Sequence, residues 1–558
     1  MPKILIKEID NTSPGTPGSY ANYSVLIAGY KGTPSTKADA KIVQPDSNGV
    51  YEFSSRQAFE DTIGVTKDEK DNGVSITSSD TATDYHYGKR MAYELLNLGY
   101  TVIYAPIESV TELADESFWE IFKDKASYDF RFVSHGLLET TGNAADYEAL
   151  TEINNYVKAS IKALEEIKTA AESVTGFAEK SEDDKKAEYV KAYKAVIETK
   201  GNEKLFRDPS TFDKAAAIYF GENKYDSAVA NYGPDADGKI AAQNEIEGML
   251  AIYDNDNISI GTLNGANGCI AKLASYRTVD GVTMCDGRGD CVALIELDER
   301  SYYDSAMSVI KKPEVLIVNG INDMSASIGE EGAYCALTVP SVYYKMGKDP
   351  VKFPGAFHYL ACFMSSLSSG FAEWYAAAGY TRGVSSYVVD HTTVKLGEIA
   401  INALEPRNLV DDPSKVQPAF ASNVIANFRG SYYLWGNRTA SKLTSAAGGG
   451  DLVAQHFLNI RQLCATIKKQ LYVACRRFTF DPNSDTLWFN FVNAITPTLD
   501  SMKSDQGIRD YKVIKVYTDK KATLKAKIRI IPIEAVEDFD LEISLEDSFG
   551  ETSAVVTE

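Results

Sequence analysis

Residues that could support acid–base or nucleophilic chemistry are scattered along this chain of 558 residues. No histidine has the spacing of a metal-binding or nucleophile motif; the five are His86, His135, His358, His391 and His456. The adjacent pair Ser134–His135 has the residue types of a nucleophile and its base, but it follows an apolar run and stands where a turn is expected. We therefore predict no catalytic residue and keep a serine hydrolase as the alternative.

Metal and nucleotide sites are not predicted either. Cys285 and Cys291 are separated by a short loop with two glycines and have no second pair of ligands, which argues against zinc. The segment Gly29–Thr33 lacks the GxxxxGK[ST] spacing of a phosphate-binding loop. We expect no cofactor, and we interpret the cysteines as free thiols in a reducing compartment because no apolar signal segment opens the chain.

Charge and composition narrow the classes of partner. The chain has 57 Lys and Arg against 78 Asp and Glu, a formal net charge of −21. Such a charge disfavours binding to nucleic acid or to anionic membranes, and no run of about 18 apolar residues is present to span a bilayer. Proteins are therefore the expected partners, and the length predicts two to four folding units.

The most regular part of the sequence lies between residues 428 and 513. A strand-like aromatic run, Tyr432–Trp435, ends in a polar turn, and a long amphipathic helix is expected after Gly448–Gly450. A second helix should begin near Asp481–Asn483 and end before Gly507. Its apolar positions recur at helical spacing, and they are Leu487, Phe491, Ile495 and Leu499.

This stretch resembles the C-terminal domain of contractile-tail sheath proteins, which wrap the tube of myophage tails, R-type bacteriocins and related injection machines. The order and spacing of several motifs carry the resemblance, since each motif alone is weak. The matching motifs are Trp435–Thr439 (WGNRT), Phe457–Leu463 (FLNIRQL) with Arg461, Phe480–Asn483, Leu487–Trp488, and Gly507–Ile508 leading to Tyr511–Val513.

The resemblance implies a structural subunit and not an enzyme. Such subunits stack as hexameric rings around a tail tube and shorten irreversibly, driving the tube through the bacterial envelope for genome ejection. The implied partners are further copies of the chain, the tail tube protein, and the baseplate and tail terminator proteins, with no nucleic acid and no membrane insertion. The implied location is the virion tail sheath, assembled in the host bacterial cytoplasm. A non-phage machine such as an R-type bacteriocin, or a subtilisin-like hydrolase, stays open as an alternative.

The resemblance also implies a multidomain fold that combines α/β and α+β units. We expect a subtilisin-like α/β outer domain and an α+β inner domain, with extended β arms at both ends. The Ala-, Glu- and Lys-rich insertion should form two exposed helices, either projecting outward or packed as a hairpin of the same domain. The expected segments are an arm at 1–20, an N-terminal subdomain at 21–115, an α/β sheath domain at 116–395 with the insertion around 145–200, an inner tube-facing domain at 396–545, and an acidic tail at 546–558.

Apolar runs predict the strands of the α/β part. Ser24–Gly29, Cys291–Leu297 and Val315–Asn319 are continuous apolar runs, which are typical of strands buried on both faces. A helix over Tyr87–Leu98 should lead into a strand that begins at Thr101. These elements suit an α/β sheet.

Both ends of the chain alternate apolar and charged residues. Lys3–Ile9 and Asp538–Leu545 could each pair within their own subunit, or could reach a neighbouring subunit as in sheath proteins. The expected acceptor is the pair of strands Lys512–Tyr517 and Leu524–Ile530. The candidate inter-subunit residues are Ile4, Ile6, Phe539, Leu541, Ile543 and Leu545.

The long helix is unusual in its charge. The segment Leu452–Phe480 contains no acidic residue, although the chain as a whole is strongly negative. A run of this kind is either a solvated face or a docking face. On the docking interpretation, Arg461, Lys468 and Lys469 are the candidates to face an acidic stripe on the tail tube.

Overall fold

The computed structural model describes residues 23–65, 86–138, 261–297, 313–397, 420–441 and 454–533, parts of 166–195, and residues 401 and 404. Short gaps occur inside the ranges 261–297, 313–397 and 454–533. The predicted arms at 1–20 and 538–545, the acidic tail and most of the helical insertion lie outside the described residues.

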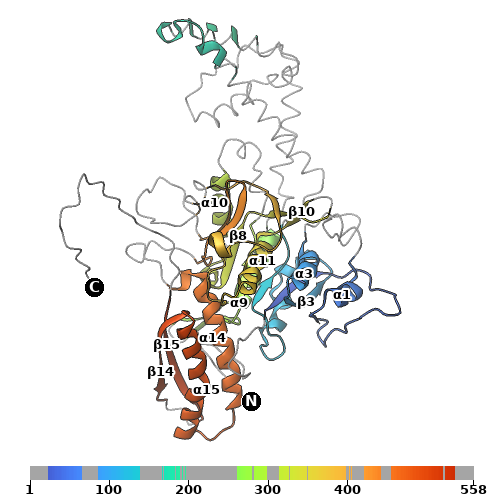
Figure 1. Cartoon of the computed structure of the whole chain (residues 1–558), viewed down its shortest axis with the longest axis vertical. Helices are drawn as coiled ribbons and strands as arrows, with labels where there is room; N and C mark the ends of the chain where they lie inside the picture. Colours follow the sequence, from blue (N-terminus) through green and yellow to red (C-terminus); the bar gives the residue numbers. More distant parts are fainter. Residues whose placement is uncertain are drawn as a thin grey trace, which may run out of the picture.

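An eight-stranded sheet organises the chain, in the order β13-β12-β8-β7-β4-β1-β3-β2 (Figure 1). The six inner strands are parallel, and β2 and β13 run antiparallel at the two edges. The strands are β1 (Ser24–Tyr30), β2 (Tyr51–Phe53), β3 (Thr101–Ile107), β4 (Phe132–Ser134), β7 (Val292–Ile295), β8 (Cys335–Val339), β12 (Asn423–Phe428) and β13 (Ser431–Trp435).

Helices cover both faces of this sheet. Alternate residues of β1 enter two different hydrophobic cores, with Leu26 in one and Val25 in the other, because successive side chains of a strand point to opposite faces. The first core also holds α9 (Gly261–Ala274) and α10 (Pro313–Met324), and the second holds α3 (Gly88–Asn97) and α11 (Gly355–Ser368). The predicted α/β class is thus confirmed.

The run Val315–Asn319 is helical and not a strand, so that prediction is wrong. It lies inside α10, whose first residue is Pro313, a favoured position for proline. Ile317, Val318 and Ile321 are buried on the sheet. A short apolar run cannot distinguish a buried strand from the covered face of a helix.

The predicted segment boundaries do not separate the sheets. Strands β1–β3 from the predicted subdomain 21–115 and β12–β13 from the predicted inner domain 396–545 both belong to the eight-stranded sheet. Parallel pairing of β12 with β8 joins the last strands to the middle of the chain. The α/β unit therefore extends to residue 435 of the described chain.

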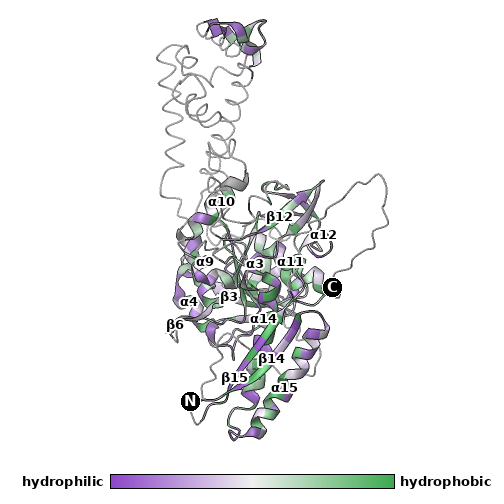
Figure 2. Ribbon diagram, turned by 90° about the vertical axis from the view of Figure 1, so that its left-hand side faces the viewer, coloured by the Kyte–Doolittle hydropathy of each residue, from purple (hydrophilic) through white to green (hydrophobic). Residues whose placement is uncertain are grey.

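Beside this sheet lies a helical and antiparallel unit, below the α/β unit in Figure 1. It consists of α14 (Leu458–Arg477), α15 (Asp485–Ser504), β14 (Ile508–Val516) and β15 (Lys525–Pro532). Ser484 caps α15 by accepting the Leu487 N–H at 3.3 Å. The predicted apolar stripe of α15 is buried, and Figure 2 shows hydrophobic and hydrophilic residues side by side on α15, β14 and β15. These elements confirm the predicted helices and strands.

Smaller elements surround the two units. They are α1 (Arg56–Phe59) with a π turn (Glu60–Gly64), α4 (Glu116–Glu120), the hairpin β5 (Tyr276–Val279) and β6 (Val282–Asp286), α12 (Gly379–Arg382), and a sheet of β9 (Val342–Lys345), β10 (Pro350–Phe353) and β11 (Val389–Thr392).

Helix α11 begins in close contact with the sheet. A Cβ built on Gly355 would lie 1.9 Å from the carbonyl oxygen of Thr338 in β8. The buried carboxylate of Glu296 accepts the Ala356 N–H at 2.9 Å and so satisfies one of the free donors of the first turn. Only glycine therefore fits at the start of α11.

We predict that Gly355→Ala destabilises the protein by about 1–3 kcal/mol, because the methyl group would force α11 away from β8. Thermal and urea unfolding would measure the loss. Gly397→Ala is the matched control, since a Cβ there meets no atom of the described residues within 4 Å. Equal stability of the two variants would contradict the close packing of α11.

Candidate functional site

The order of the parallel strands reverses at β1. The chain places β3 on one side of β1 and then returns to place β4 on the other side. Open α/β sheets bind ligands at the carboxyl ends of strands at such a point. Here backbone occupies it: a Cβ built on Gly88 would lie 1.8 Å from the Ala28 carbonyl oxygen, and one on Gly136 would lie 2.5 Å from Gly88 Cα. The Tyr87 N–H also donates to the Gly136 carbonyl at 2.6 Å. Close-packed backbone therefore stands where a ligand would lie.

The pair Ser134–His135 follows β4 at this point and does not form a catalytic dyad. His135 donates from Nε2 to Asn267 Oδ1 at 2.9 Å and accepts the Leu137 N–H at Nδ1, also at 2.9 Å. Ser134 Oγ accepts the Gly136 N–H at 3.2 Å. Because both ring nitrogens are engaged, His135 cannot act as base for Ser134, and this pair does not serve the hydrolase alternative.

Burial keeps the two histidines of this region neutral. It lowers the pKa of His86 to about 3 and that of His135 to about 4. His86 donates from Nε2 to the His135 carbonyl at 2.9 Å, and its Nδ1 accepts the Gly88 N–H at 3.3 Å. Both rings therefore act as neutral hydrogen-bonding links between β4, α3 and α9.

A second set of reactive residue types lies in the core near α11. His358 Nδ1 lies 2.6 Å from the Tyr344 hydroxyl, and Cys362 Sγ lies 3.5 Å from His358 Nε2. All three are fully buried. Burial lowers the pKa of His358 to about 3 and raises the pKa of the Cys362 thiol far above its ordinary value. A buried neutral thiol is a poor nucleophile, so these residues serve packing.

Within the described ranges, no three His, Cys, Asp or Glu side chains are close enough together to hold a metal ion. Over the same residues, no helix has both the length and the apolarity needed to cross a membrane. The six predicted arm residues lie outside the described chain, so the structure does not place them.

The WGNRT motif, which begins with the last residue of β13, forms hydrogen bonds with the start of α14. Asn437 accepts the Leu458 N–H with its carbonyl at 2.9 Å and the Asn459 N–H with Oδ1 at 3.0 Å. It also donates from Nδ2 to Asn459 Oδ1 at 2.7 Å. Two donors of the first helical turn are thereby satisfied. The Arg438 guanidinium lies 4.8 Å from the centre of the Phe457 ring and completes the junction.

The three basic residues of α14 that were predicted to face a tail tube point into the molecule in this subunit, and docking to a tube stays a prediction. Arg461, Lys468 and Lys469 are only 7%, 4% and 1% exposed. The Arg461 guanidinium lies 4.0 Å from the centre of the Tyr334 ring, and Lys468 Nζ donates to the Gly289 carbonyl at 2.7 Å. These contacts would have to break before either side chain could reach another protein.

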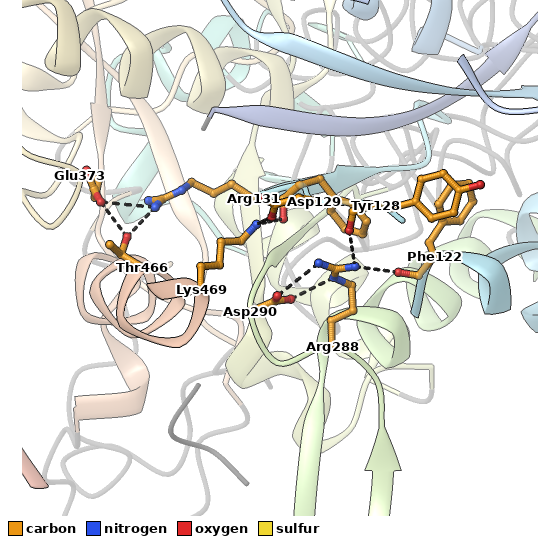
Figure 3. A network of polar contacts seen from close by, with 10 residues as sticks. Phe122, Tyr128, Asp129, Arg131, Arg288, Asp290, Glu373, Thr466 and Lys469 are labelled. Carbon is orange, nitrogen blue, oxygen red and sulfur yellow. Dashed lines mark hydrogen bonds and ion pairs between the residues drawn. The ribbon is translucent and has the colours of Figure 1, made fainter. Parts of the chain in front are cut away.

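Lys469 enters a layer of charged groups at the amino ends of β4 and β7. Its Nζ donates to the Phe130 carbonyl at 2.7 Å and pairs with the Asp129 carboxylate (Figure 3). Burial lowers the pKa of Lys469, while Asp290 and Asp129 act in the opposite direction. The ammonium group thus exchanges its water for acceptors of the α/β unit.

Arg131 forms a second link to α14. Its guanidinium donates to Glu373 at 3.4 Å, to Gln462 at 3.3 Å and to the hydroxyl of Thr466. Thr466 in turn donates to Glu373 at 2.7 Å. Figure 3 shows Arg131, Thr466 and Glu373 pointing toward one another. A buried arginine therefore ties β4, α14 and the segment after α11 together.

Arg288 and Asp290 complete the layer beneath β7. Arg288 donates from Nε to Asp290 at 2.9 Å and from Nη1 to the carbonyls of Phe122 and Tyr128 at 3.0 and 2.8 Å. Burial disfavours the charged carboxylate, but Arg288 and nearby lysines hold the pKa of Asp290 below its ordinary value. Sequence reasoning placed these residues in a plain loop, because nothing in their local pattern indicates burial.

Comparison with protein-family models and with curated protein sequences gives no match. Among solved structures, the chain is similar to a chain of the anti-feeding prophage (AFP) baseplate determined by cryo-EM, over 98% of this chain and 99% of that chain, at 12% identity and a TM-score of 0.46. It is also similar to a chain of the PVC sheath complex of an extracellular contractile injection system in the contracted state. That match covers 46% of this chain and 71% of the other, at 15% identity and a TM-score of 0.33.

We predict that Arg131→Met lowers the free energy of unfolding by about 3 kcal/mol, because Glu373 would remain buried without its cationic partner. Urea unfolding would measure this. Glu373→Gln in the same chain should recover part of the loss, since it removes the unpaired charge. The proposed coupling would be contradicted if Arg131→Met had no effect. It would also be contradicted if the losses of unfolding free energy from the two substitutions simply added in the double variant.

The buried histidines predict a loss of stability in acid. His135 has its pKa lowered to about 4 in the folded chain, against an ordinary value of 6.5. Between these pH values the unfolded state binds a proton that the folded state does not, so stability falls as pH falls from 6.5 toward 4. His135→Gln should reduce the slope of the free energy of unfolding against pH by up to about 1.4 kcal/mol per pH unit, which corresponds to one proton. His391→Gln, at an exposed position, is the control; equal slopes in the two variants would contradict this prediction.

Proposed function

We propose that this chain is a structural subunit of a contractile tail sheath and not an enzyme. Copies of the chain form six-membered rings that stack helically around a tail tube, and repacking of this lattice drives the tube through a bacterial envelope. The extended lattice stores the energy and releases it on shortening, without hydrolysis. The partners are further copies of the chain and the tube, baseplate and terminator proteins of a phage virion assembled in the bacterial cytoplasm.

One observation carries the proposal: the residues that resemble sheath motifs meet in one connected junction. WGNRT holds the first turn of α14, α14 packs on α15, and α15 leads through Gly507 into β14. Gly507 lies against Trp374, since a Cβ built there would be 3.0 Å from three ring atoms. Trp374 also donates from Nε1 to the Asp505 carbonyl at 3.0 Å. Motifs that together build one structural unit support a family resemblance better than motifs scattered over a surface.

The alternatives differ in what would support them. A sheath of a non-phage injection machine would need the same subunit architecture, and gene neighbourhood beside capsid and terminase genes would distinguish the two. The hydrolase alternative is less favoured, because both nitrogens of His135 are engaged in other hydrogen bonds.

The pair of strands β14 and β15 supports assembly through strand exchange. One face packs against α15, and among the described residues neither outer edge pairs with a third strand. An open edge of this kind accepts added strands. We infer that the arms at 1–20 and 538–545 reach neighbouring subunits, so that the lattice stays connected while it shortens.

Deleting residues 1–20, or ending the chain after Glu537, should leave a folded monomer that no longer polymerises. Electron microscopy of purified protein should show tubes for the full chain and none for either truncated form. Circular dichroism and a thermal melt would show that folding is kept. Deleting 145–200 with a Gly-Ser bridge is the control, because the described helical pieces there lie far from β14 and β15 (Figure 1).

Sheaths of normal length and stability from either truncated protein would show that these strands pair within their own subunit. Absence of any polymer from the full chain, alone or with tubes, would overturn the sheath proposal itself.

A further inference from the structure

Four aromatic rings form a cluster on one face of the main sheet, at its β13 edge. Tyr433 and Trp435 alternate along β13 and so point to the same face. The ring of Tyr380, in α12, lies 4.8 Å from that of Tyr433 and 5.1 Å from that of Trp435. The ring of Phe428 lies 4.9 Å from that of Trp435. These three contacts are edge-to-face, a favourable arrangement for aromatic pairs, and they join the four rings into one group, the aromatic cluster.

The protein covers the aromatic cluster only in part. Phe428 and Trp435 pack against the first hydrophobic core, whereas Tyr380 is 61% exposed. Within the described residues, the Trp435 indole N–H and the hydroxyls of Tyr380 and Tyr433 have no hydrogen-bond partner. Exposed rings with free polar groups at their ends are typical of a surface that binds another protein.

The turn between β12 and β13 places a cation beside the cluster. Both central residues of this turn have positive φ, 52° at Arg429 and 87° at Gly430. Asn, Asp or Gly is preferred at the first of these positions, so an arginine there is strained. Arg429 is exposed, and within the described chain it forms no ion pair or hydrogen bond. The hairpin gains nothing from the guanidinium group, which favours a role for it in binding.

The composition of this surface indicates the charge of its partner. Tyr, Trp and Arg are the residue types that most often dominate the binding energy of protein interfaces. The two segments that form the surface, 376–389 and 420–441, contain no acidic residue, although the whole chain has a net charge of −21. An acidic protein surface with an apolar centre is therefore complementary to it, and a second copy of the chain supplies such a surface.

That complementary surface surrounds α4. Residues 108–125 contain six acidic residues and two lysines. The side chains of Glu116 and Glu120 are 64% and 63% exposed, although Lys272 and Lys123 contact them. Ile121, the next residue after α4, is 37% exposed. Figure 2 shows α4 and α12 on opposite sides of the α/β unit. Complementary surfaces on opposite sides of one subunit produce a head-to-tail contact, which closes into a ring if the rotation between copies allows it.

We propose that the aromatic cluster and Arg429 of one copy dock on the acidic surface around α4 of the next copy. This inference rests on the proposed sheath function and specifies one contact between neighbours in a ring. Acidic residues near α4 pair with Arg429, and Ile121 packs against the rings. The contact belongs to the α/β unit and uses neither the β14–β15 pair nor the terminal arms.

Photo-cross-linking in the full chain identifies the partner directly. p-Benzoylphenylalanine replaces Tyr380, which keeps an aromatic ring at this position, and the protein is mixed with unchanged chain labelled with heavy nitrogen. Irradiation should give a dimer in which position 380 is joined to a labelled peptide from 108–125, identified by mass spectrometry. This measurement stays informative even if other substitutions in the cluster disturb folding.

A second measurement tests whether the contact contributes to association. The variant Tyr380→Ala with Arg429→Glu should raise the protein concentration for half-association, measured by sedimentation velocity, by about tenfold or more. The matched control, Ile42→Ala with Lys41→Glu, also removes one exposed apolar side chain and reverses one exposed charge. It should associate like the unchanged protein. Circular dichroism would show that both variants are folded.

The other outcomes overturn the proposal. A cross-link within one chain, or to a different segment of the second copy, would show that another group covers the aromatic cluster. Unchanged association of the Tyr380→Ala, Arg429→Glu variant, or an equal loss in the control, would remove this contact while leaving the sheath function intact. If the unchanged chain formed no polymer, alone or with tubes, the sheath function would fall as well.

Discussion

Burial of the positive charge on α14 is the constraint on which the rest of the structure depends. Lys468 and Lys469 could not leave water without acceptors, because an isolated buried cation is strongly unfavourable, and Arg461 lies over the Tyr334 ring. The acceptors are found at the amino ends of β4 and β7, as the carbonyls of residues 130 and 289 and the carboxylate of Asp129. Hydrogen-bond geometry therefore sets the orientation of α14, and α14 sets the position of α15, β14 and β15.

The two ends of the parallel sheet are used differently from those of an α/β enzyme. At the carboxyl ends of β1 and β4, the backbone of Gly88 and Gly136 is closely packed. At the amino ends, a helix from the C-terminal part of the chain covers the strands. Open backbone edges and exposed basic side chains occur together on β14 and β15, where contacts with another chain are possible. This distribution is typical of a protein whose sheet supports an interaction surface.

Sequence reasoning succeeded where periodicity was strong and local. The buried stripe of α15, the length of α14, and the alternation in β15 follow from spacing within a few turns or strands. It failed where the deciding partner is distant. A helix with basic residues and no acids looks solvated in sequence, and only the fold brings Asp129 and Glu373 to it. The run in α10 was ambiguous for a different reason, since buried strands and covered helices share apolar residues. The predicted segment boundaries are crossed by one sheet, which gathers strands from residues 24 to 435.

The long separation between these partners has a consequence for the order in which the chain matures. Asp129 and Lys469 are 340 positions apart, and Arg131 and Thr466 are 335 apart. At ribosomal rates this interval takes roughly 20 to 70 s. During that time β4 and β7 emerge with unpaired charges at one end and without β12 beside β8. The nascent chain therefore passes through a partly built state that is open to chaperones and aggregation, and β14 and β15 emerge only after the groups that orient α14 have been made. The unit built from α14, α15, β14 and β15 is therefore the last of the described parts to be positioned.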